Sequence, residues 1–575
     1  MDNPDRITYF AATDSRGKRV PFGIKSRDRE RHMYVIGKTG MGKSTLLENM
    51  AIQDIRNGEG LAFIDPHGSA VDKLLDYIPA ERVKDVIYFA PFDLENPIAF
   101  NVMEDVGYDK RHLVVSGLMA TFKKIWVDAW SARMEYILTN TLLALLEYPD
   151  ATLMGVNRMY TDKAYRKKVV DNVKDPLVKD FWTKEFAQYT DRFTQEATPA
   201  IQNKIGQFTS NPLIRNIIGQ PKSSFDMREA MDTKKILLIN LSKGLVGDTN
   251  MKLLGSMITT RIFLGAMSRA DLAAADIAKL PKFYFYVDEF QNFANETFAE
   301  ILSEARKYKL NLLVAHQYVE QMEEEVRAAV FGNVGTTVSF RVGPFDAEVL
   351  ETVFSPEFMK EDLVNLGFAQ IYLSLMINGE GSRPFSAVTI PPIEAPPRSY
   401  RNEVIEMSRK QFATERAKIE ELIYNDLAPS LDAPPEPAPK KQYGPPDRKP
   451  AAARAASSEP RREAPRKEAP RREEPRPEPK AKSAEDLKAI LRTMTDGAKK
   501  EKQKEQKTQQ SSVRTALKEV IQGTELPSRP ERPKLERKQE APRPQKHEPP
   551  PPKSDGPRPF EIPEDTLREI FKDNV

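Results

Sequence analysis

The first part of the chain alternates between short apolar runs and stretches whose apolar residues recur at helical spacing. Met33–Ile36 is an apolar run of strand length, and an amphipathic stretch follows it from Leu46 to Ile55. Further short strands are expected at Ile7–Ala12, Arg19–Lys25, Leu61–Ile64 and Val86–Ala90. Strands that alternate with helices predict a parallel sheet, in which ligands bind at the carboxyl ends of the strands.

The pattern turns helical from about Val102 to Thr233. In Asp128–Glu147, for example, apolar residues recur every three or four positions. This helical stretch is far longer than one crossover between strands requires. It predicts an all-helical subdomain, with boundaries 104–233, inserted into the sheet-forming part of the chain.

Strand-like runs resume after the helical region and predict the second half of the same sheet. Asn378-Gly379 indicates a hairpin near its end. Arg401–Asp426 is expected to form one amphipathic closing helix. The fold class is therefore α/β, with a mostly parallel sheet. The expected strands are Lys235–Leu241, Phe283–Val287, Leu312–Ala315, Thr337–Val342, Ile371–Met376 and Phe385–Ile390.

Proline and charged residues dominate the chain after about Leu427, and more than half of the 45 prolines lie there. Such a segment cannot bury enough apolar surface to offset its conformational entropy, so a disordered tail is expected. Its short amphipathic segments either fold on a partner or form transient helices without one; they are Ala484–Met494, Val513–Ile521 and Pro563–Phe571. The predicted organisation is 1–103 (N-terminal strands and first half of the core), 104–233 (helices), 234–427 (second half of the core) and 428–575 (tail).

Composition narrows the classes of function. The chain has no cysteine, which excludes disulfides, thiolate metal sites and catalytic thiols. It has neither an apolar run long enough to span a bilayer nor a secretory signal, so we expect a cytoplasmic protein that meets a membrane only through partners. The net charge is +3, but the tail is basic, which leaves the rest of the chain net negative. DNA contacts there require local basic groups; Lys243 and Lys204 are candidates, although each also fits an ordinary surface lysine.

Residues 37–45 carry the phosphate-binding loop pattern, a glycine, four residues and then Gly-Lys-Ser. The glycines allow backbone N–H groups to surround an anion, Lys43 reaches the β- and γ-phosphates, and the Ser44 hydroxyl holds Mg²⁺. A strand before the loop and a helix after it argue against a chance glycine-rich turn. The sequence predicts a nucleoside triphosphate site made by Gly37, Lys38, Thr39, Gly40, Met41, Gly42, Lys43, Ser44 and Thr45.

The apolar run Phe283–Val287 ends in two acids, Asp288 and Glu289. This is the second motif of many ATPases, in which the aspartate holds Mg²⁺, usually through water, and the glutamate polarises the attacking water. Gln317 closes the next strand, where its amide would sense the γ-phosphate, orient water or only end the strand. Asp65 closes an earlier strand, where it would either lie near the nucleotide or cap a turn.

Arg306 lies between these two strand ends in the sequence. It is either a surface arginine or, in a ring of subunits, a residue that reaches the neighbour's nucleotide and neutralises transition-state charge. Arg341 is a second candidate for the same task.

The chain resembles the HerA–FtsK superfamily of ring-forming DNA pumps. More closely, it is similar to the conjugative coupling proteins of type IV secretion (the TraD/TraG group) and to HerA-like helicases. The resemblance covers roughly residues 5–425. The stretches that carry it, in order and spacing, are His32–Thr45, Ile64–Gly68, Asp288–Asn292 and Glu304–Gln317.

This resemblance implies a RecA-like P-loop core with an inserted helical domain, a homo-hexamer, and ATP- and Mg²⁺-dependent movement of single- or double-stranded DNA through a central channel. Membrane-embedded members carry N-terminal transmembrane helices, which are not found here, so a soluble role in conjugation or DNA processing is expected. Channel or DNA-processing proteins would be contacted through the tail. The roles implied by position are phosphate and Mg²⁺ binding by Lys43 and Ser44, catalysis by Asp288 and Glu289, sensing by Gln317 and action in trans by Arg306.

Two other functions fit part of this pattern. Related motors power protein secretion or pilus assembly, and DNA stimulation of ATP hydrolysis separates them from a DNA motor. A catalytically weak scaffold whose tail recruits partners is disfavoured, because a protein without catalysis would more readily lack one of the motif residues Lys43, Ser44, Asp288, Glu289 and Gln317.

Overall fold

The computed structural model describes residues 3–14, 17–104, 106–189 and 191–431, which lie within the unit Met1–Tyr443. The predicted tail, 428–575, lies outside the described residues except for its first four positions, which end the last helix. Its three amphipathic segments also lie outside them.

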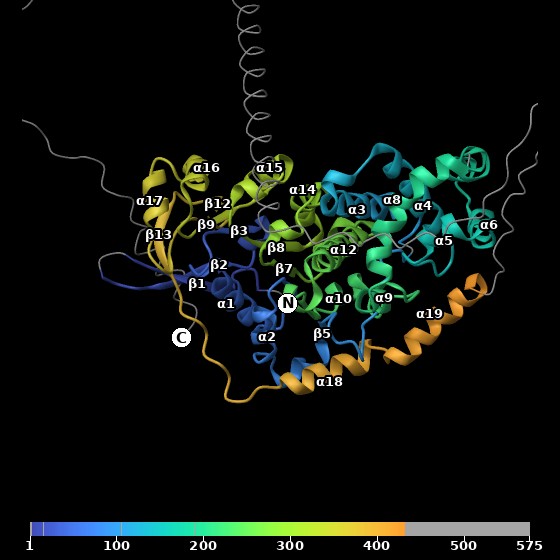
Figure 1. The fold of residues 1–575 in the computed structure, drawn as a ribbon. Helices are drawn as coiled ribbons and strands as arrows, with labels where there is room; N and C mark the ends of the chain where they lie inside the picture. Colours follow the sequence, from blue (N-terminus) through green and yellow to red (C-terminus); the bar gives the residue numbers. More distant parts are fainter. Residues whose placement is uncertain (1–2, 15–16, 105, 190, 432–575) are drawn as a thin grey trace, which may run out of the picture. The chain divides into compact units, whose positions relative to one another are not determined.

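Within the described residues, an 11-stranded sheet forms the centre of the unit, in the order β2-β1-β13-β10-β9-β3-β8-β7-β4-β6-β5 (Figure 1). The strands from β9 to β5 are parallel, as the sequence predicts. They are β3 (Met33–Ile36), β4 (Gly60–Asp65), β5 (Val86–Phe89), β6 (Ile236–Asn240), β7 (Phe283–Val287), β8 (Leu310–His316) and β9 (Thr336–Ser339). The antiparallel strands are β1 (Ile7–Thr13), β2 (Pro21–Lys25), β10 (Gln370–Ser374) and β13 (Phe385–Thr389).

The parallel strands are buried on both faces. In β3, Met33 and Val35 belong to one apolar cluster, which they share with α1 (Lys43–Arg56) and α2 (Ser69–Leu75). Tyr34 belongs to a second cluster, on the other face. Helices on both faces explain why these strands read as continuous apolar runs in the sequence. The second cluster is shared with α12 (Asp248–Met267), α14 (Glu296–Glu304) and α15 (Glu324–Asn333).

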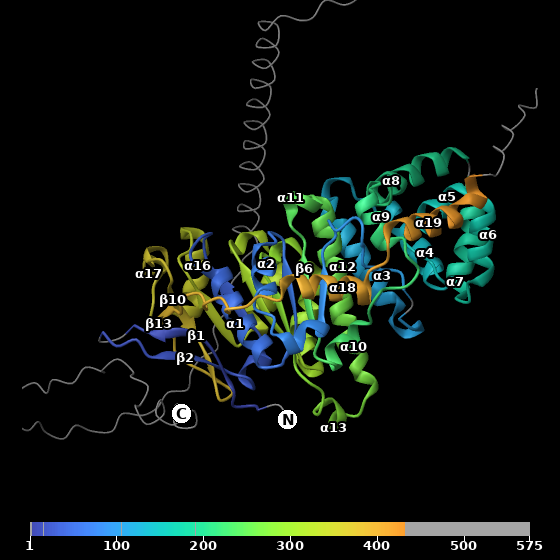
Figure 2. The ribbon, with the colours of Figure 1, turned by 90° about the horizontal axis from the view of Figure 1, so that it is seen from below.

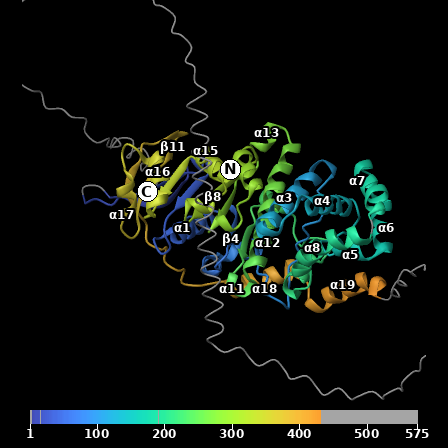
Figure 3. The ribbon, with the colours of Figure 1, turned by 45° about the horizontal axis from the view of Figure 1, so that its top comes forward.

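The residues between β5 and β6 form helices that gather together, on the side of the unit away from α16 and α17 (Figures 1, 2 and 3). Of these helices, α3 also packs against α12 and α14, which belong to the sheet-forming part. The helices of this region are α3 (Arg111–Ile125), α4 (Ala132–Leu146), α5 (Gly155–Thr161), α6 (Lys163–Asn172), α7 (Pro176–Asp180), α8 (Asp191–Thr209), α9 (Pro212–Ile218) and α10 (Met227–Asp232).

The remaining α-helices and β-strands before Arg401 are short, apart from the 11-residue helix α16. Asn378 and Gly379 have positive φ, and they form the turn of the predicted hairpin between β11 and β12. These elements are α11 (Lys243–Val246), α13 (Ala274–Ile277), α16 (Pro344–Phe354), α17 (Lys360–Asn365), β11 (Met376–Ile377) and β12 (Glu380–Gly381).

The prediction of one closing helix over Arg401–Asp426 is wrong, because the chain forms two helices there, α18 (Arg401–Phe412) and α19 (Arg416–Leu431). Between them, Ala413 has extended backbone and forms a β-bridge with Ile98. The N–H groups of Thr414 and Arg416 donate to the carbonyls of Pro97 and Glu95, in place of hydrogen bonds that would continue the helix. The predicted strand over 337–342 likewise ends early, at Ser339.

Candidate functional site

Strand order brings the two predicted motifs to one edge of the sheet. Strand β8 lies between β3, which precedes the phosphate loop, and β7, which precedes the acidic pair. Ile36 lies opposite His316, and Val287 lies opposite Val314, so the three strands end at nearly the same level. Because all three run parallel, the residues that follow them share one site.

The phosphate loop has the backbone that its glycines predict. Gly40 has φ of 77° and Gly42, which caps α1, has φ of 116°, a region that favours glycine. A Cβ atom at Gly42 would lie 3.2 Å from the Phe340 ring. The Lys38 N–H donates to the Arg341 carbonyl at 2.8 Å and anchors the loop to the segment after β9. A curled loop at the start of a 14-residue helix is an anion-binding geometry.

Lys43 is buried at the base of this loop. Its Nζ donates to the Gly37 carbonyl oxygen at 2.7 Å. Burial lowers the pKa of Lys43, and the nearby carboxylates of Glu289 and Asp288 oppose that effect. A desolvated ammonium group held at the loop is suited to bind phosphate oxygens.

Ser44 and Asp288 lie side by side, where the hydroxyl donates to the carboxylate Oδ2 at 2.8 Å. Burial raises the pKa of Asp288 to about 6, and the charges of Glu289 and Asp65 add to this effect, whereas Ser44 and Lys43 oppose it. Mg²⁺ prefers hard oxygen ligands beside phosphates. This hydroxyl and carboxylate therefore fit Mg²⁺, which would also favour the ionised form of Asp288.

Two amide groups fix the carboxylate of Glu289. Gln317 Nε2 donates to Oε1 and Gln291 Nε2 donates to Oε2, each at 2.6 Å. Glu289 itself has φ of 47°, a left-handed conformation that costs on the order of 1–3 kcal/mol in a residue other than glycine and that surrounding contacts must hold. Its side chain is buried and oriented, as an activator of water requires.

The structure therefore brings the predicted Lys43, Ser44, Asp288, Glu289 and Gln317 together. Sequence reasoning missed Gln291. The available signal was a polar residue in the turn directly after the acidic pair.

The other candidates lie elsewhere. Asp65 accepts from the N–H groups of His67 and Ala70, each at 2.7 Å, so it caps the turn before α2. Arg341 borders the phosphate loop of its own chain through its carbonyl group. Arg306 is exposed before the start of β8, at the opposite end of that strand from Gln317. A strand of 7 residues spans roughly 23 Å, so Arg306 cannot reach its own chain's phosphate loop.

The two predicted DNA-contacting lysines lie far apart in the sequence and in different settings. Lys243 is exposed on α11, after β6, and its Nζ lies 2.7 Å from Asp248 Oδ1. Lys204 is on α8, and its Nζ lies 5.8 Å from the centre of the Trp126 ring. Of the two, Lys243 is the one at the carboxyl edge of the sheet.

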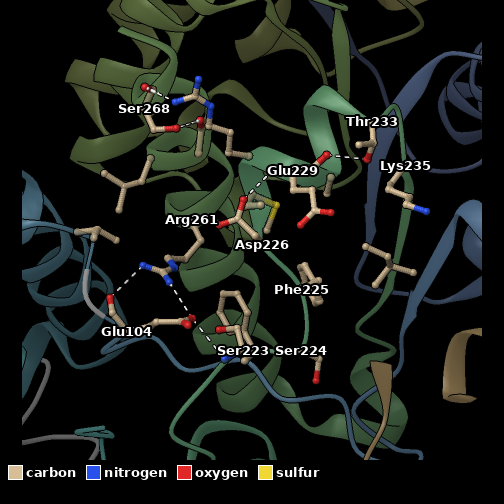
Figure 4. A pocket seen from close by; sticks show the side chains of 18 of the residues that line it. Glu104, Ser223, Ser224, Phe225, Asp226, Glu229, Thr233, Lys235, Arg261 and Ser268 are labelled. Carbon is tan, nitrogen blue, oxygen red and sulfur yellow. Dashed lines mark hydrogen bonds and ion pairs between the residues drawn. The ribbon is translucent and has the colours of Figure 1, made fainter. Parts of the chain in front are cut away.

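A cavity of about 600 Å³ lies at the β5–β6 end of the sheet, beside α10 and α12 (Figure 4). Figure 4 shows Arg261 pointing toward Glu104, and its guanidinium group donates to the Glu104 carboxylate at 3.3 Å. Asp226 accepts from the Glu229 N–H at 2.7 Å and caps α10. These charged groups hold local structure, and the phosphate loop lies several strands away.

The glycine-rich loop and the acidic pair follow two strands of one parallel sheet, with a third strand between them that ends in an amide. This arrangement defines a P-loop nucleotide hydrolase with a RecA-like core. Within that class, the chain belongs to the family described as the type IV secretion-system coupling protein DNA-binding domain, whose profile matches residues 18–352. The predicted resemblance is thus confirmed.

Solved structures with similar folds have low sequence identity to the chain. The bacterial conjugative coupling protein TrwBdeltaN70, in an unbound monoclinic form, is 14% identical, with a TM-score of 0.47, and the match covers 66% of this chain and 88% of that one. TrwB in complex with ADP and Mg²⁺ is 15% identical, with a TM-score of 0.46 and coverage of 66% and 89%. VirB4 of Thermoanaerobacter pseudethanolicus is 14% identical, with a TM-score of 0.42 and coverage of 70% and 99%.

No curated protein sequence matches the chain. Among the helices that the structure describes, none has the length and apolar content needed to cross a bilayer.

Proposed function

We propose that this chain is an ATPase motor of conjugative DNA transfer, which couples ATP hydrolysis to the movement of DNA. The observation that carries the proposal is the Glu289 carboxylate, which two amides orient beside Lys43 and the Ser44–Asp288 pair. Family membership supports DNA as the substrate, because the matching domain is described as DNA-binding.

The residues of the chain divide the chemistry between them. Lys43 and the loop N–H groups bind the β- and γ-phosphates and neutralise their charge. Ser44 and Asp288 would hold Mg²⁺, which would neutralise charge that develops on the phosphate oxygens. Glu289 accepts a hydrogen bond from the attacking water and aligns it with the γ-phosphate. Gln317, which binds Glu289 and follows the strand beside the phosphate loop, senses whether that phosphate is present.

The motor acts as a homo-hexameric ring with DNA in its channel. Lys243, exposed on α11 at the carboxyl edge of the sheet, contacts DNA phosphates rather than bases. The helical region, 104–233, is an all-helical subdomain inserted between the core halves 1–103 and 234–427. The tail, 428–575, binds secretion-channel or DNA-processing proteins and connects a cytoplasmic motor to the membrane.

Arg306 acts on the nucleotide of the neighbouring subunit. Arg306→Ala is expected to lower turnover by about 10³-fold, because a trans-acting arginine stabilises transition-state charge. Mixing Arg306→Ala with Glu289→Gln subunits should restore part of the activity, measured as phosphate release across mixing ratios. Lys307→Ala, an exposed neighbour, should keep parental turnover. Mixtures without any recovery would contradict a role in trans.

The proposed function is tested by ATP hydrolysis of the full chain with and without single- and double-stranded DNA, at low and moderate salt. We expect stimulation by at least one kind of DNA, weaker at higher salt because the contacts are to phosphates. Robust hydrolysis that ignores both kinds of DNA would overturn the DNA motor and favour an ATPase that acts on protein substrates in secretion or pilus assembly.

A further inference from the structure

Lys124 joins the helical region to the turn that follows Glu289. It lies in the last turn of α3 and is partly buried. Its Nζ donates to the carbonyl oxygen of Gln291 at 2.8 Å and also to that of Ala294. A lysine from one region thus binds two backbone carbonyl groups just beyond the catalytic pair.

The turn that Lys124 binds is the one that positions Glu289. After Glu289, the chain forms a short 3-10 helix, Phe290–Asn292, and the Ala294 N–H donates back to the Phe290 carbonyl at 2.8 Å. Gln291 in this turn connects Lys124 to Glu289. The Gln291 side chain donates to the Glu289 carboxylate, and the Gln291 backbone carbonyl accepts a hydrogen bond from Lys124. Two hydrogen bonds, one to the carbonyl and one from the side chain of Gln291, therefore link Lys124 to the Glu289 carboxylate.

A second contact holds the same turn from α12. The Phe293 ring is buried against Gly255, where a Cβ atom would lie 2.1 Å from the ring. Helix α12 packs closely against α3, so the two helices that contact this turn also contact each other. Helix α12 begins directly after α11, which carries the proposed DNA contact Lys243.

The charge on Lys124 is sensitive to its surroundings. Burial lowers its pKa to about 8; the carboxylate of Glu323 opposes this shift and the ammonium group of Lys252 on α12 adds to it. His316, on β8, faces the same region, and burial lowers its pKa to about 3, so it is neutral near pH 8. Lys124 thus changes charge between pH 7 and pH 9, and its hydrogen bonds to the two carbonyl groups are strongest when it is protonated.

We propose that Lys124 is a positioning residue for ATP hydrolysis, which fixes the turn behind Glu289 and transmits the state of the helical region to that carboxylate. This inference rests on the proposed function. It predicts that contacts on the helical region, DNA binding included, change the rate of hydrolysis through the hydrogen bonds of Lys124.

The test compares Lys124→Met and Lys124→Arg in the full chain. A misplacement of about 1 Å at a reacting group costs on the order of 100-fold in rate, so we expect kcat of Lys124→Met to fall by about 10- to 100-fold. The KM for ATP and the affinity for an ATP analogue should stay within about twofold, because Lys124 binds the turn and not the phosphate loop. Lys124→Arg keeps a charged donor and should recover most of the parental kcat. Lys167→Met, an exposed lysine of the helical region, is the matched control with parental kcat.

The pH profile separates positioning from a merely structural role. In the parent, kcat should decline above about pH 8, where Lys124 loses its proton. Lys124→Arg should stay level over the same range, because arginine remains charged. Parental kcat in Lys124→Met would overturn the inference but not the proposed function. The same holds if Lys124→Met and Lys124→Arg have equally low kcat and a lowered melting temperature. A parent without ATPase activity would overturn the proposed function and the inference together.

Discussion

Lys43→Ala is expected to lower ATP hydrolysis by at least about 100- to 1,000-fold, the cost of removing one preorganised donor to charge that develops in the transition state. The ammonium group is buried at the phosphate loop and lies near Glu289 and Asp288, so alanine removes positive charge at the place where phosphate oxygens would bind. The loss of positive charge should also weaken ATP binding. Phosphate release at saturating ATP measures the loss of hydrolysis, and binding of a labelled ATP analogue measures the loss of affinity.

The fold should survive this substitution. Alanine loses the two hydrogen bonds from Nζ, to the Gly37 carbonyl at 2.7 Å and to the Lys38 carbonyl at 3.4 Å, each worth about 1 kcal/mol or less, but it also removes a charge that burial disfavours. The melting temperature should therefore stay close to that of the parent. Lys279→Ala, an exposed lysine after α13, is the matched control with parental hydrolysis. Unchanged hydrolysis in Lys43→Ala would show that the phosphate loop is not the site of turnover.

Glu289→Gln is expected to bind ATP with parental affinity and to hydrolyse it about 100- to 10,000-fold more slowly, the usual contribution of a positioned general base. An amide cannot accept a proton from water, but it keeps the shape of the side chain. The new NH₂ group faces an amide donor, so Gln291 or Gln317 must turn its amide and present its carbonyl oxygen to keep a hydrogen bond there. Single-turnover hydrolysis and analogue binding separate the chemical step from affinity.

The matched control for this substitution is Glu325→Gln, an exposed glutamate on α15. It removes the same charge without touching the site, so its turnover should equal that of the parent. Parental turnover in Glu289→Gln would show that another group activates water. A loss of ATP binding in place of turnover would show that the carboxylate mainly supports the phosphate loop.

Much of the site could be predicted because its signals are local. A glycine pattern specifies the backbone of a phosphate loop, and an apolar run followed by Asp288 and Glu289 specifies a strand with acids at its end. The contact between Glu289 and Gln317 depends in addition on β8 lying next to β7. Apolar runs do not encode which strands become neighbours, so that contact required the sheet order.

Features built from distant segments could not be predicted in this way. The break near Ala413 depends on the bridge to Ile98, more than 300 positions away in the sequence. Lys124 sits in an ordinary helical pattern, and only its packing against the Gln291 turn distinguishes it. The side-chain pattern within one segment carries no record of the partner that a long-range contact supplies.

The central claim is that ATP hydrolysis at this site moves DNA. Its most direct test is displacement by the full chain of streptavidin from biotinylated single-stranded DNA and of a third strand from triplex-bearing duplex DNA. We predict displacement on at least one of these tracks with ATP, and none with a non-hydrolysable analogue or with Lys43→Ala. DNA binding and ATP hydrolysis without displacement on either track would contradict the claim.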